Sequence, residues 1–228
     1  MTRNIFFLLA MSYFLAACQG QNEAVAVGSV YNDEAANALQ PQRVKNKKLA
    51  TLAFDSGATA QTCDEYTRLI AIATLKEDVN NQLAKGEYLL CEVLAIVGDK
   101  KLRPGRQDVM YGQALANRLD LRSFPSSLFQ MLDEKKYSLS HLDEKALKVQ
   151  STVVTYETAD WYYRLELVAT LDVNNNGKAD WVLWLADEAK SGNYRQYQTL
   201  IVYDVSDKGR MTAVPYEATV KNTQRQRQ

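Results

Sequence analysis

Apolar residues recur at helical spacing through the first half of the chain. Between residues 62 and 132 they lie three or four positions apart, so that they would line one side of a helix. The residues in this pattern are Tyr66, Leu69, Ile70, Ala73, Leu83, Leu90, Leu94, Val97, Val109, Leu115 and Leu119. We therefore predict that helices dominate residues 62–132.

Two helix ends can be placed from single residues. Thr62 followed by Glu65 matches a capping box, in which each side chain accepts a hydrogen bond from the other residue's free backbone N–H. Gly98 suits the left-handed conformation that ends many helices. We expect one helix to begin at Thr62 and another to end at Gly98.

The second half of the chain has the composition of strands. β-Branched and aromatic residues fill five runs, at 149–156, 161–171, 181–185, 197–205 and 211–216. The turns between them are short, which favours antiparallel neighbours. We predict an α+β fold in one globular domain at 48–218, with an N-terminal helical hairpin region packed on a C-terminal antiparallel β-meander at 146–217.

The chain starts with a segment that has the layout of a secretory signal. One basic residue, Arg3, precedes an apolar run at 5–15. This run is shorter than the roughly 20 apolar residues that a transmembrane helix needs. We predict a cleaved signal peptide at 1–17.

The next residues indicate how the exported chain is held. Leu15, Ala16, Ala17 and Cys18 resemble the lipobox of bacterial lipoproteins, and the whole chain resembles uncharacterised gammaproteobacterial lipoproteins. The lipobox resemblance implies that Cys18 carries diacylglycerol and an acylated amino group such as palmitate, and two acyl chains suffice for stable anchoring. An inner-membrane retention signal has Asp at the position of Gln19, so Gln19 implies that the protein moves to the outer membrane. There it would face either the periplasm or the cell surface. The alternative is an ordinary signal cut near Ala17 that releases a soluble protein.

The segments that flank the predicted domain are polar. Residues 18–47 contain Pro41 and a lysine cluster, and we interpret them as a flexible tether with a reach of roughly 30 Å. The short run at 24–30 could instead form a strand. We expect the tail at 219–228 to be disordered.

Three cysteines leave an odd thiol in an exported protein. Lipid on Cys18 would remove the odd one, and Cys63 and Cys91 would then form a disulfide in an oxidising compartment. Two buried, reduced cysteines are the alternative if the chain stays in the cytoplasm. For the disulfide to cross a helical hairpin, the turn must lie near residue 77, which places Gly86 inside the second helix.

One segment carries recognisable metal chemistry. Residues 172–180 resemble the calcium loops written D-x-D-x-D-G-x-x-D, found in EF-hands, dockerins and integrin-type propeller repeats. The resemblance implies oxygen ligands from Asp172, Asn174, Asn176 and Asp180, the backbone carbonyl of Lys178, and a sharp turn at Gly177. Position 12 of the loop is a leucine instead of the bidentate Glu of an EF-hand. The alternative is a plain hairpin turn, because Asn-Gly alone favours one.

Composition excludes one class of partner. The chain has 27 basic and 27 acidic side chains and no basic stretch interleaved with aromatic residues, so nucleic-acid binding has no electrostatic basis. Hydrophobic residues make up 46% of the chain, which is enough for a packed core.

Catalytic candidates are few. His141 is the only histidine and suggests a surface or capping role, and Asp187 and Glu188 with Asp160 could form a carboxylate pair of the glycosidase kind. A group of aromatic residues could instead stack on sugar rings: Trp161, Tyr162, Tyr163, Trp181, Trp184, Tyr194 and Tyr197.

We therefore predict a non-enzymatic envelope lipoprotein that acts as a structural, adaptor or binding module for an envelope protein or the cell wall. The alternative is a hydrolase or carbohydrate-binding protein that acts on envelope polymers.

Overall fold

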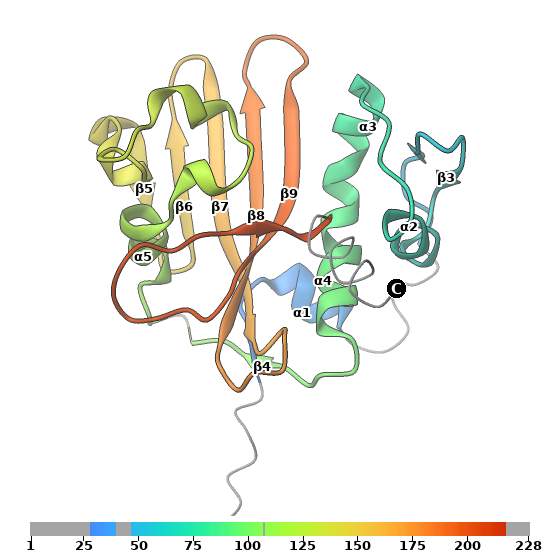
Figure 1. Ribbon diagram of the computed structural model, residues 1–228, viewed down its shortest axis with the longest axis horizontal. Helices are drawn as coiled ribbons and strands as arrows, with labels where there is room; N and C mark the ends of the chain where they lie inside the picture. The colour runs from blue at the N-terminus through green and yellow to red at the C-terminus, as the bar shows by residue number, and fades with distance from the viewer. Residues whose placement is uncertain (1–27, 40–46, 107, 218–228) are drawn as a thin grey trace, which may run out of the picture.

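The structure is a computed structural model that describes residues 28–39, 47–106 and 108–217 (Figure 1). The predicted signal peptide at 1–17, the lipidation site Cys18 and the predicted tail at 219–228 lie outside the described residues. Among the described residues, every helix is too short or too polar to cross a membrane.

Helices and strands are both present, so the predicted α+β class is confirmed. The α-helices are α1 (Asp33–Ala38), α2 (Cys63–Ile70), α3 (Val79–Ala84), α4 (Leu89–Val97) and α5 (Tyr111–Arg118). The 3₁₀ helices are η1 (Lys85–Tyr88), η2 (Leu121–Ser123), η3 (Ser127–Met131), η4 (Leu139–His141) and η5 (Glu144–Ala146). The long strands follow the helices in the chain, where β-branched and aromatic residues dominate.

The main sheet contains eight strands. Its members are β1 (Ser29–Val30), β4 (Arg103–Pro104), β5 (Leu147–Val149), β6 (Val153–Glu157), β7 (Trp161–Leu171), β8 (Asp180–Ala189), β9 (Arg195–Val202) and β10 (Val214–Pro215). Strands β5 to β10 each pair antiparallel with the next in the chain, and β1 pairs antiparallel with β7 while β4 lies parallel to β1. The sheet is therefore mixed, and it takes two short strands from outside the region where the sequence predicts strands.

The predicted tether at 18–47 is wrong for residues 28–39, which belong to the fold. Val30 pairs with Ala169 of β7 and is buried. Asn32 then caps α1, because its side-chain oxygen accepts the Ala35 N–H at 2.9 Å. Gly28 is required at this junction, since a Cβ there would lie 2.2 Å from the Thr170 carbonyl oxygen. The strand considered within 24–30 is therefore present at its C-terminal end.

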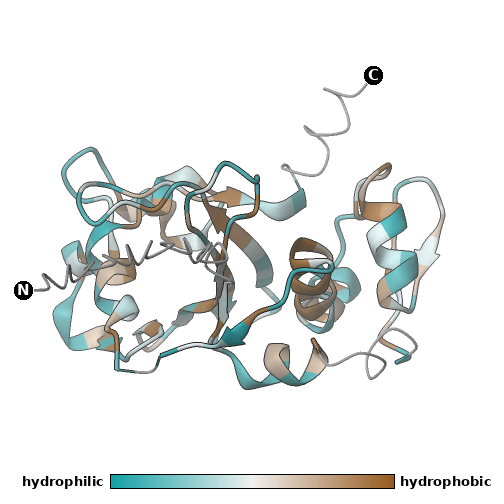
Figure 2. Ribbon diagram, turned by 90° about the horizontal axis from the view of Figure 1, so that it is seen from below, coloured by the Kyte–Doolittle hydropathy of each residue, from teal (hydrophilic) through white to brown (hydrophobic). Residues whose placement is uncertain are grey.

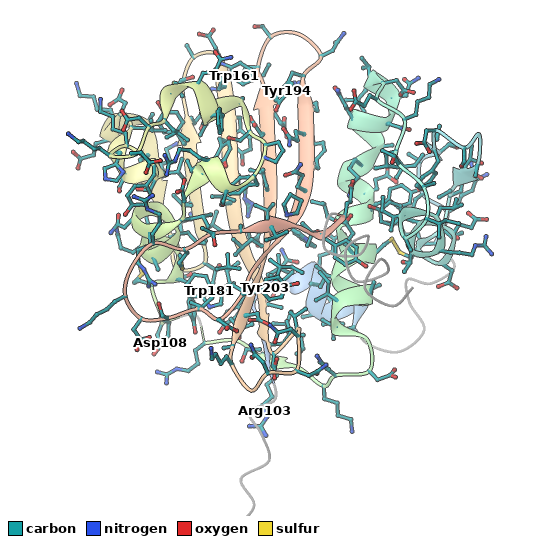
Figure 3. The ribbon with its side chains drawn as sticks, viewed as in Figure 1. Arg103, Asp108, Trp161, Trp181, Tyr194 and Tyr203 are labelled. Atoms are coloured by element: carbon teal, nitrogen blue, oxygen red, sulfur yellow. A yellow bond between two sulfur atoms is a disulfide. The ribbon has the colours of Figure 1, made fainter. Side chains whose placement is uncertain are left out.

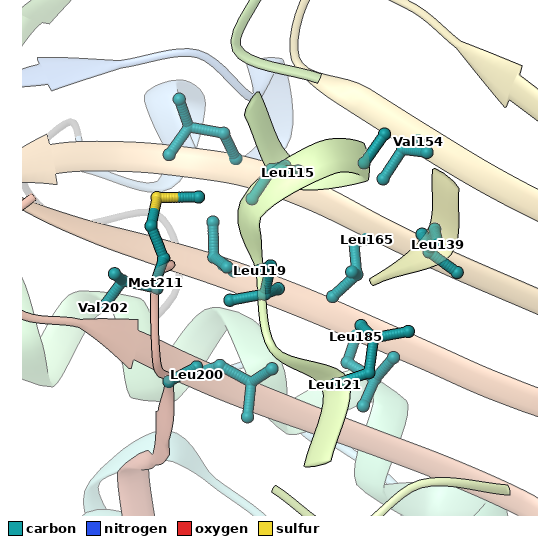
Figure 4. Close-up of a cluster of buried hydrophobic side chains, with 14 of the residues drawn as sticks. Leu115, Leu119, Leu121, Leu139, Val154, Leu165, Leu185, Leu200, Val202 and Met211 are labelled. Carbon is teal, nitrogen blue, oxygen red and sulfur yellow. The ribbon is translucent and has the colours of Figure 1, made fainter. Parts of the chain in front are cut away.

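Each face of the sheet is covered by different elements. Helix α5 and η2 to η4 cover one face and form the largest core, with Leu115, Leu165 and Leu185 at its centre (Figure 4). Helices α1 and α4 cover part of the other face, around Val93 and Val182. Figure 2 shows apolar residues, in brown, on strands of the sheet and on the helix that packs against it. The sheet thus separates two packed layers.

A third cluster lies on the outer side of α4. There α2 and the two-stranded sheet of β2 (Leu52–Ala53) and β3 (Thr59–Ala60) pack around Tyr66 and Tyr88. The predicted disulfide is confirmed: Cys63 and Cys91 are bonded, both are buried, and their Cα atoms lie 5.0 Å apart. Figure 3 shows this bond in yellow beside α4.

Both predicted helix ends are confirmed. The Thr62 hydroxyl accepts the Glu65 N–H at 3.3 Å and caps α2, and α4 ends at Gly98. Gly98 has a φ of 55° and a ψ of −128°, so its φ is positive as expected but the residue is not in the left-handed helical conformation. The Glu65 carboxylate accepts the N–H of Gln61 at 2.8 Å. Gly86 lies in η1, between α3 and α4, where a Cβ would lie 3.4 Å from the Tyr197 ring. At that distance a side-chain carbon would make an ordinary contact with the ring, and Gly86 lies within an unbroken helical run from Val79 to Val97.

Candidate functional site

The predicted calcium residues form the loop between β7 and β8, at the lower end of the sheet in Figure 1. The Asp172 carboxylate accepts the backbone N–H groups of Asn176 at 3.0 Å and Gly177 at 2.7 Å. Positive φ angles at Asn175 and Gly177 allow the chain to wrap around this carboxylate. The loop therefore closes on an aspartate at its first position.

The two asparagine oxygens also face loop N–H groups. The Asn174 side chain accepts the Asn176 N–H at 3.2 Å, and the Asn176 side chain accepts the Lys178 N–H at 2.9 Å. Side-chain oxygens at loop positions 1, 3 and 5 thus turn inward, in the alternation that the calcium pattern implies. In this structure these oxygens accept hydrogen bonds from backbone N–H groups of the loop.

Asp180 closes the base of the loop. Its carboxylate is fully buried and accepts the N–H groups of Val173 and Asp204, both at 2.7 Å. The predicted ligand at position 9 therefore ties the loop to the segment that follows β9. A buried carboxylate with two N–H donors is a strong local constraint, because hydrogen bonds to ionised groups are stronger than neutral ones.

Asp204 joins this site although no motif in the sequence marks it. Its carboxylate accepts the Asn176 amide at 2.6 Å and the Lys178 ammonium at 2.9 Å. These hydrogen bonds, that from Asn176 first, lower the pKa of the Asp204 carboxyl. The pairing crosses from one loop to another, so no local spacing in the sequence could have indicated it. Within the described residues, no group of three or more His, Cys, Asp or Glu side chains is arranged to hold a metal ion.

Two of the three suspected carboxylates, Asp187 and Glu188, do not share a surface. Asp187 and Glu188 are consecutive in β8, so their side chains leave opposite faces of the sheet. Asp187 is fully buried and accepts the backbone N–H of Ser127 at 2.7 Å and its hydroxyl at 2.5 Å. Burial raises the pKa of Asp187, against the effect of these bonds. This carboxylate therefore holds η3 against the sheet.

His141 has a local structural role. Its Nδ1 accepts the Ser138 N–H at 3.3 Å and lies 3.0 Å from the Ser138 hydroxyl, which completes a capping box at η4. Ser138 is fully buried. The pair therefore caps a 3₁₀ turn, as the polar context of His141 suggested.

The aromatic residues divide between the two faces of the sheet. Tyr163 and Trp181 are buried in the core. Figure 3 shows Trp161 and Tyr194 near the upper end of the sheet. Their rings are arranged edge to face, with the ring centroids 5.6 Å apart. The remaining three of the group, Tyr162, Trp184 and Tyr197, are half-buried and lie on the face toward α4, by strand alternation and register.

A groove runs between this face of the sheet and the turn from η1 into α4. We call it the sheet–helix groove; it is open to solvent on one side and has a volume of about 280 Å³. Its lining residues are Glu34, Lys47, Leu49, Cys63, Gly86, Glu87, Leu89, Leu90, Cys91, Arg164, Glu166, Trp184, Leu185, Ala186 and Tyr197. A volume of this order approaches the lower end of the range for small-molecule sites, about 300–1,000 Å³.

The polar groups of the groove carry both signs of charge. Arg164 and Glu166 form an ion pair at 2.7 Å, and the Asn32 amide donates to Glu166 at 2.8 Å. The Tyr197 hydroxyl donates to Glu188 at 3.0 Å, and burial raises the pKa of Tyr197 to about 12. The indole N–H of Trp184 is buried and has no hydrogen-bond partner among the described residues.

Comparison of the chain with protein-family models, with curated proteins and with solved structures finds no match.

Proposed function

We propose that this chain is an exported lipoprotein, anchored by lipid on Cys18, whose folded domain is a non-enzymatic binding or adaptor module of the cell envelope. The disulfide between Cys63 and Cys91 carries the proposal. Disulfides persist in oxidising compartments and are rare in the cytosol, and this pair leaves Cys18 as the odd cysteine. The lipobox-like residues supply a role for that cysteine.

The layers of the domain suit a binding role. In this proposal the predicted helical hairpin, with α2 beside α4, forms one wall of the module. The predicted meander, from β6 to β9, forms the other wall. The sheet–helix groove lies between these walls and combines apolar side chains with several charged ones. Binding sites of small ligands share this combination of apolar lining and few polar groups.

The second candidate is a protein that acts on envelope polymers. Three half-buried aromatic rings on one face of the sheet favour the carbohydrate-binding form of this candidate. Its hydrolytic form requires a groove carboxylate that takes part in the reaction. Replacing Glu166 with Gln, with the fold retained, would then abolish release of sugars from purified cell-wall polymers, whereas a pure binding protein would release none before or after the change.

Anchoring can be tested by a change at the lipidation site. Replacing Cys18 with Ser should remove the thiol that the lipid needs, so we expect the protein to leave the membrane fraction or to accumulate unprocessed. Immunoblots of fractionated envelopes measure this. Gln19→Asp is the matched control, because it should keep the lipid and move the protein to the inner membrane. An unchanged membrane association of the Cys18→Ser protein would refute the anchor.

We also propose that the β7–β8 loop binds Ca²⁺ through Asp172, Asn174, Asn176, Asp180 and the carbonyl of Lys178. The inward side-chain oxygens of the first three support it. Calcium favours such oxygen ligands in flexible geometry. Because two of the usual carboxylates are amides, we expect weak binding, with a Kd of about 10⁻⁴ to 10⁻³ M.

Calcium should raise the thermal stability of the protein. At a tenfold excess over Kd the ion stabilises the folded state by about 1.4 kcal/mol, which corresponds to a rise in melting temperature of about 3 to 6 °C for a domain of this size. Differential scanning calorimetry with and without 10 mM CaCl₂ measures the shift. Magnesium should give a smaller one, because it holds its waters more tightly.

Variants locate the calcium response. Asp172→Ala should abolish it, since the ligand oxygens at the first loop position are lost. Asn175→Gly is the matched control, because glycine also accepts the positive φ and the pattern gives residue 175 no ligand role. If the unmodified protein shows no shift at 10 mM calcium, the loop is only a turn.

A further inference from the structure

The centre of the sheet–helix groove is a hollow made by one small residue. Ala186 of β8 lies between Arg164 of β7 and Tyr197 of β9 in the same cross-strand row. Side chains in one row share a face of the sheet. A methyl group between two long side chains leaves room above it, and all three residues line the cavity.

Aromatic and apolar groups form the walls of this hollow. Trp184 lies two residues from Ala186 on the same face, and Tyr197 borders it on the next strand. The opposite wall is formed by Gly86 of η1 and by Leu89 and Leu90 of α4. A Cβ built on Gly86 would lie 3.4 Å from the Tyr197 ring, at ordinary van der Waals distance. The two walls therefore come together beside Gly86 and Tyr197.

The edge of the hollow offers hydrogen-bond donors and acceptors together. Arg164 presents guanidinium donors, and its partner Glu166 presents a carboxylate acceptor. The buried indole N–H of Trp184 lacks an acceptor among the described residues. The Trp184 nitrogen is closed to solvent in this structure, so the groove wall must shift for a ligand oxygen to reach it, and that contact would satisfy an otherwise unpaired donor.

From this arrangement we propose that the sheet–helix groove binds a neutral saccharide ring. A sugar has C–H faces that pack on aromatic rings and hydroxyls that both donate and accept around its edge. The lining carries three carboxylates, Glu34, Glu87 and Glu166, against two cations, Lys47 and Arg164, and this balance disfavours an anion. An apolar ligand would remove water from the charged edge without replacing its hydrogen bonds. The inference rests on the proposed binding role and names its ligand class.

Calorimetric titration of the full chain tests the proposal, with the trimer of N-acetylglucosamine and maltotriose as probes. We expect at least one of them to bind. Ala186→Leu fills the hollow and should raise the Kd at least tenfold. Thr155→Leu is the matched control: Thr155 lies in the same cross-strand row, on the far side of Arg164, and outside the groove lining, so the affinity should not change.

Trp184→Phe supplies a second variant that keeps an aromatic ring and removes only the N–H. Loss of one hydrogen bond predicts a Kd raised about threefold to tenfold. Circular dichroism and the melting temperature establish that each variant is folded.

Three results would overturn the proposal: no heat from either saccharide at 10 mM, equal affinity in folded Ala186→Leu, or binding of trialanine in place of the saccharides. Each would leave the anchoring proposal intact, because fractionation of the Cys18→Ser protein tests that separately.

Discussion

Replacing Glu92 with Ala is expected to lower the free energy of unfolding by about 3–5 kcal/mol. Glu92 lies in α4 with a side chain 1% exposed, and it pairs at 2.5 Å with Lys85, whose side chain is 8% exposed. The hydroxyl of Tyr66 donates to the same carboxylate oxygen. The change would leave the Lys85 ammonium buried, with only the partly exposed Glu217 at 3.4 Å as a counter-charge.

Urea unfolding followed by circular dichroism measures this loss. The double change Lys85→Met with Glu92→Leu should recover much of the stability, since a buried ion pair can often be replaced by apolar groups at little cost. Asp108→Ala is the matched control, because the Arg106–Asp108 pair at 2.6 Å is largely exposed and its removal should leave the urea midpoint nearly unchanged. A loss below about 1 kcal/mol for Glu92→Ala would show that water reaches this pair.

Removing the disulfide should lower the free energy of unfolding by a similar amount. Closing a loop of 28 residues predicts a contribution of roughly 3 to 4 kcal/mol through the entropy of the unfolded chain. We expect the Cys63→Ala, Cys91→Ala protein to unfold at correspondingly lower urea concentration. Reduction of the unmodified protein by dithiothreitol should produce the same shift, because both treatments remove the same covalent link.

The two treatments also test each other. If dithiothreitol destabilises the double variant as well, the reductant acts elsewhere and the comparison fails. If neither treatment lowers the urea midpoint, the link between α2 and α4 adds nothing to stability. Because Cys91 and Glu92 are neighbours in α4, we do not expect the effects of the two sets of changes to add.

The sequence predicts well those features that depend on neighbouring residues. The cap at Thr62 and the helix end at Gly98 are local hydrogen-bonding and φ preferences, and both are confirmed. The runs around β7 and β8 are long enough for their composition to indicate strands. The disulfide followed from the count of cysteines together with the inferred compartment.

Features that depend on tertiary contacts could not be predicted from the sequence. Strands β1 and β4 have two residues each, too few for an alternating pattern to appear. Lys85 and Asp204 look like ordinary surface charges in the sequence, yet one is buried against Glu92 and the other completes the β7–β8 loop from another part of the chain. The hollow at Ala186 exists only because Arg164 and Tyr197 meet it across two strand pairs.

The pairing of β1 with β7 limits how far the domain can stand from the bilayer. If Cys18 carries the lipid, ten residue steps separate it from Gly28, which spans at most about 35 Å when fully extended. The chain enters the sheet beside Thr170 and Leu171, next to the loop that begins at Asp172. That corner of the molecule would then point toward the lipid headgroups, where a bound cation and anionic phosphates could share one interface.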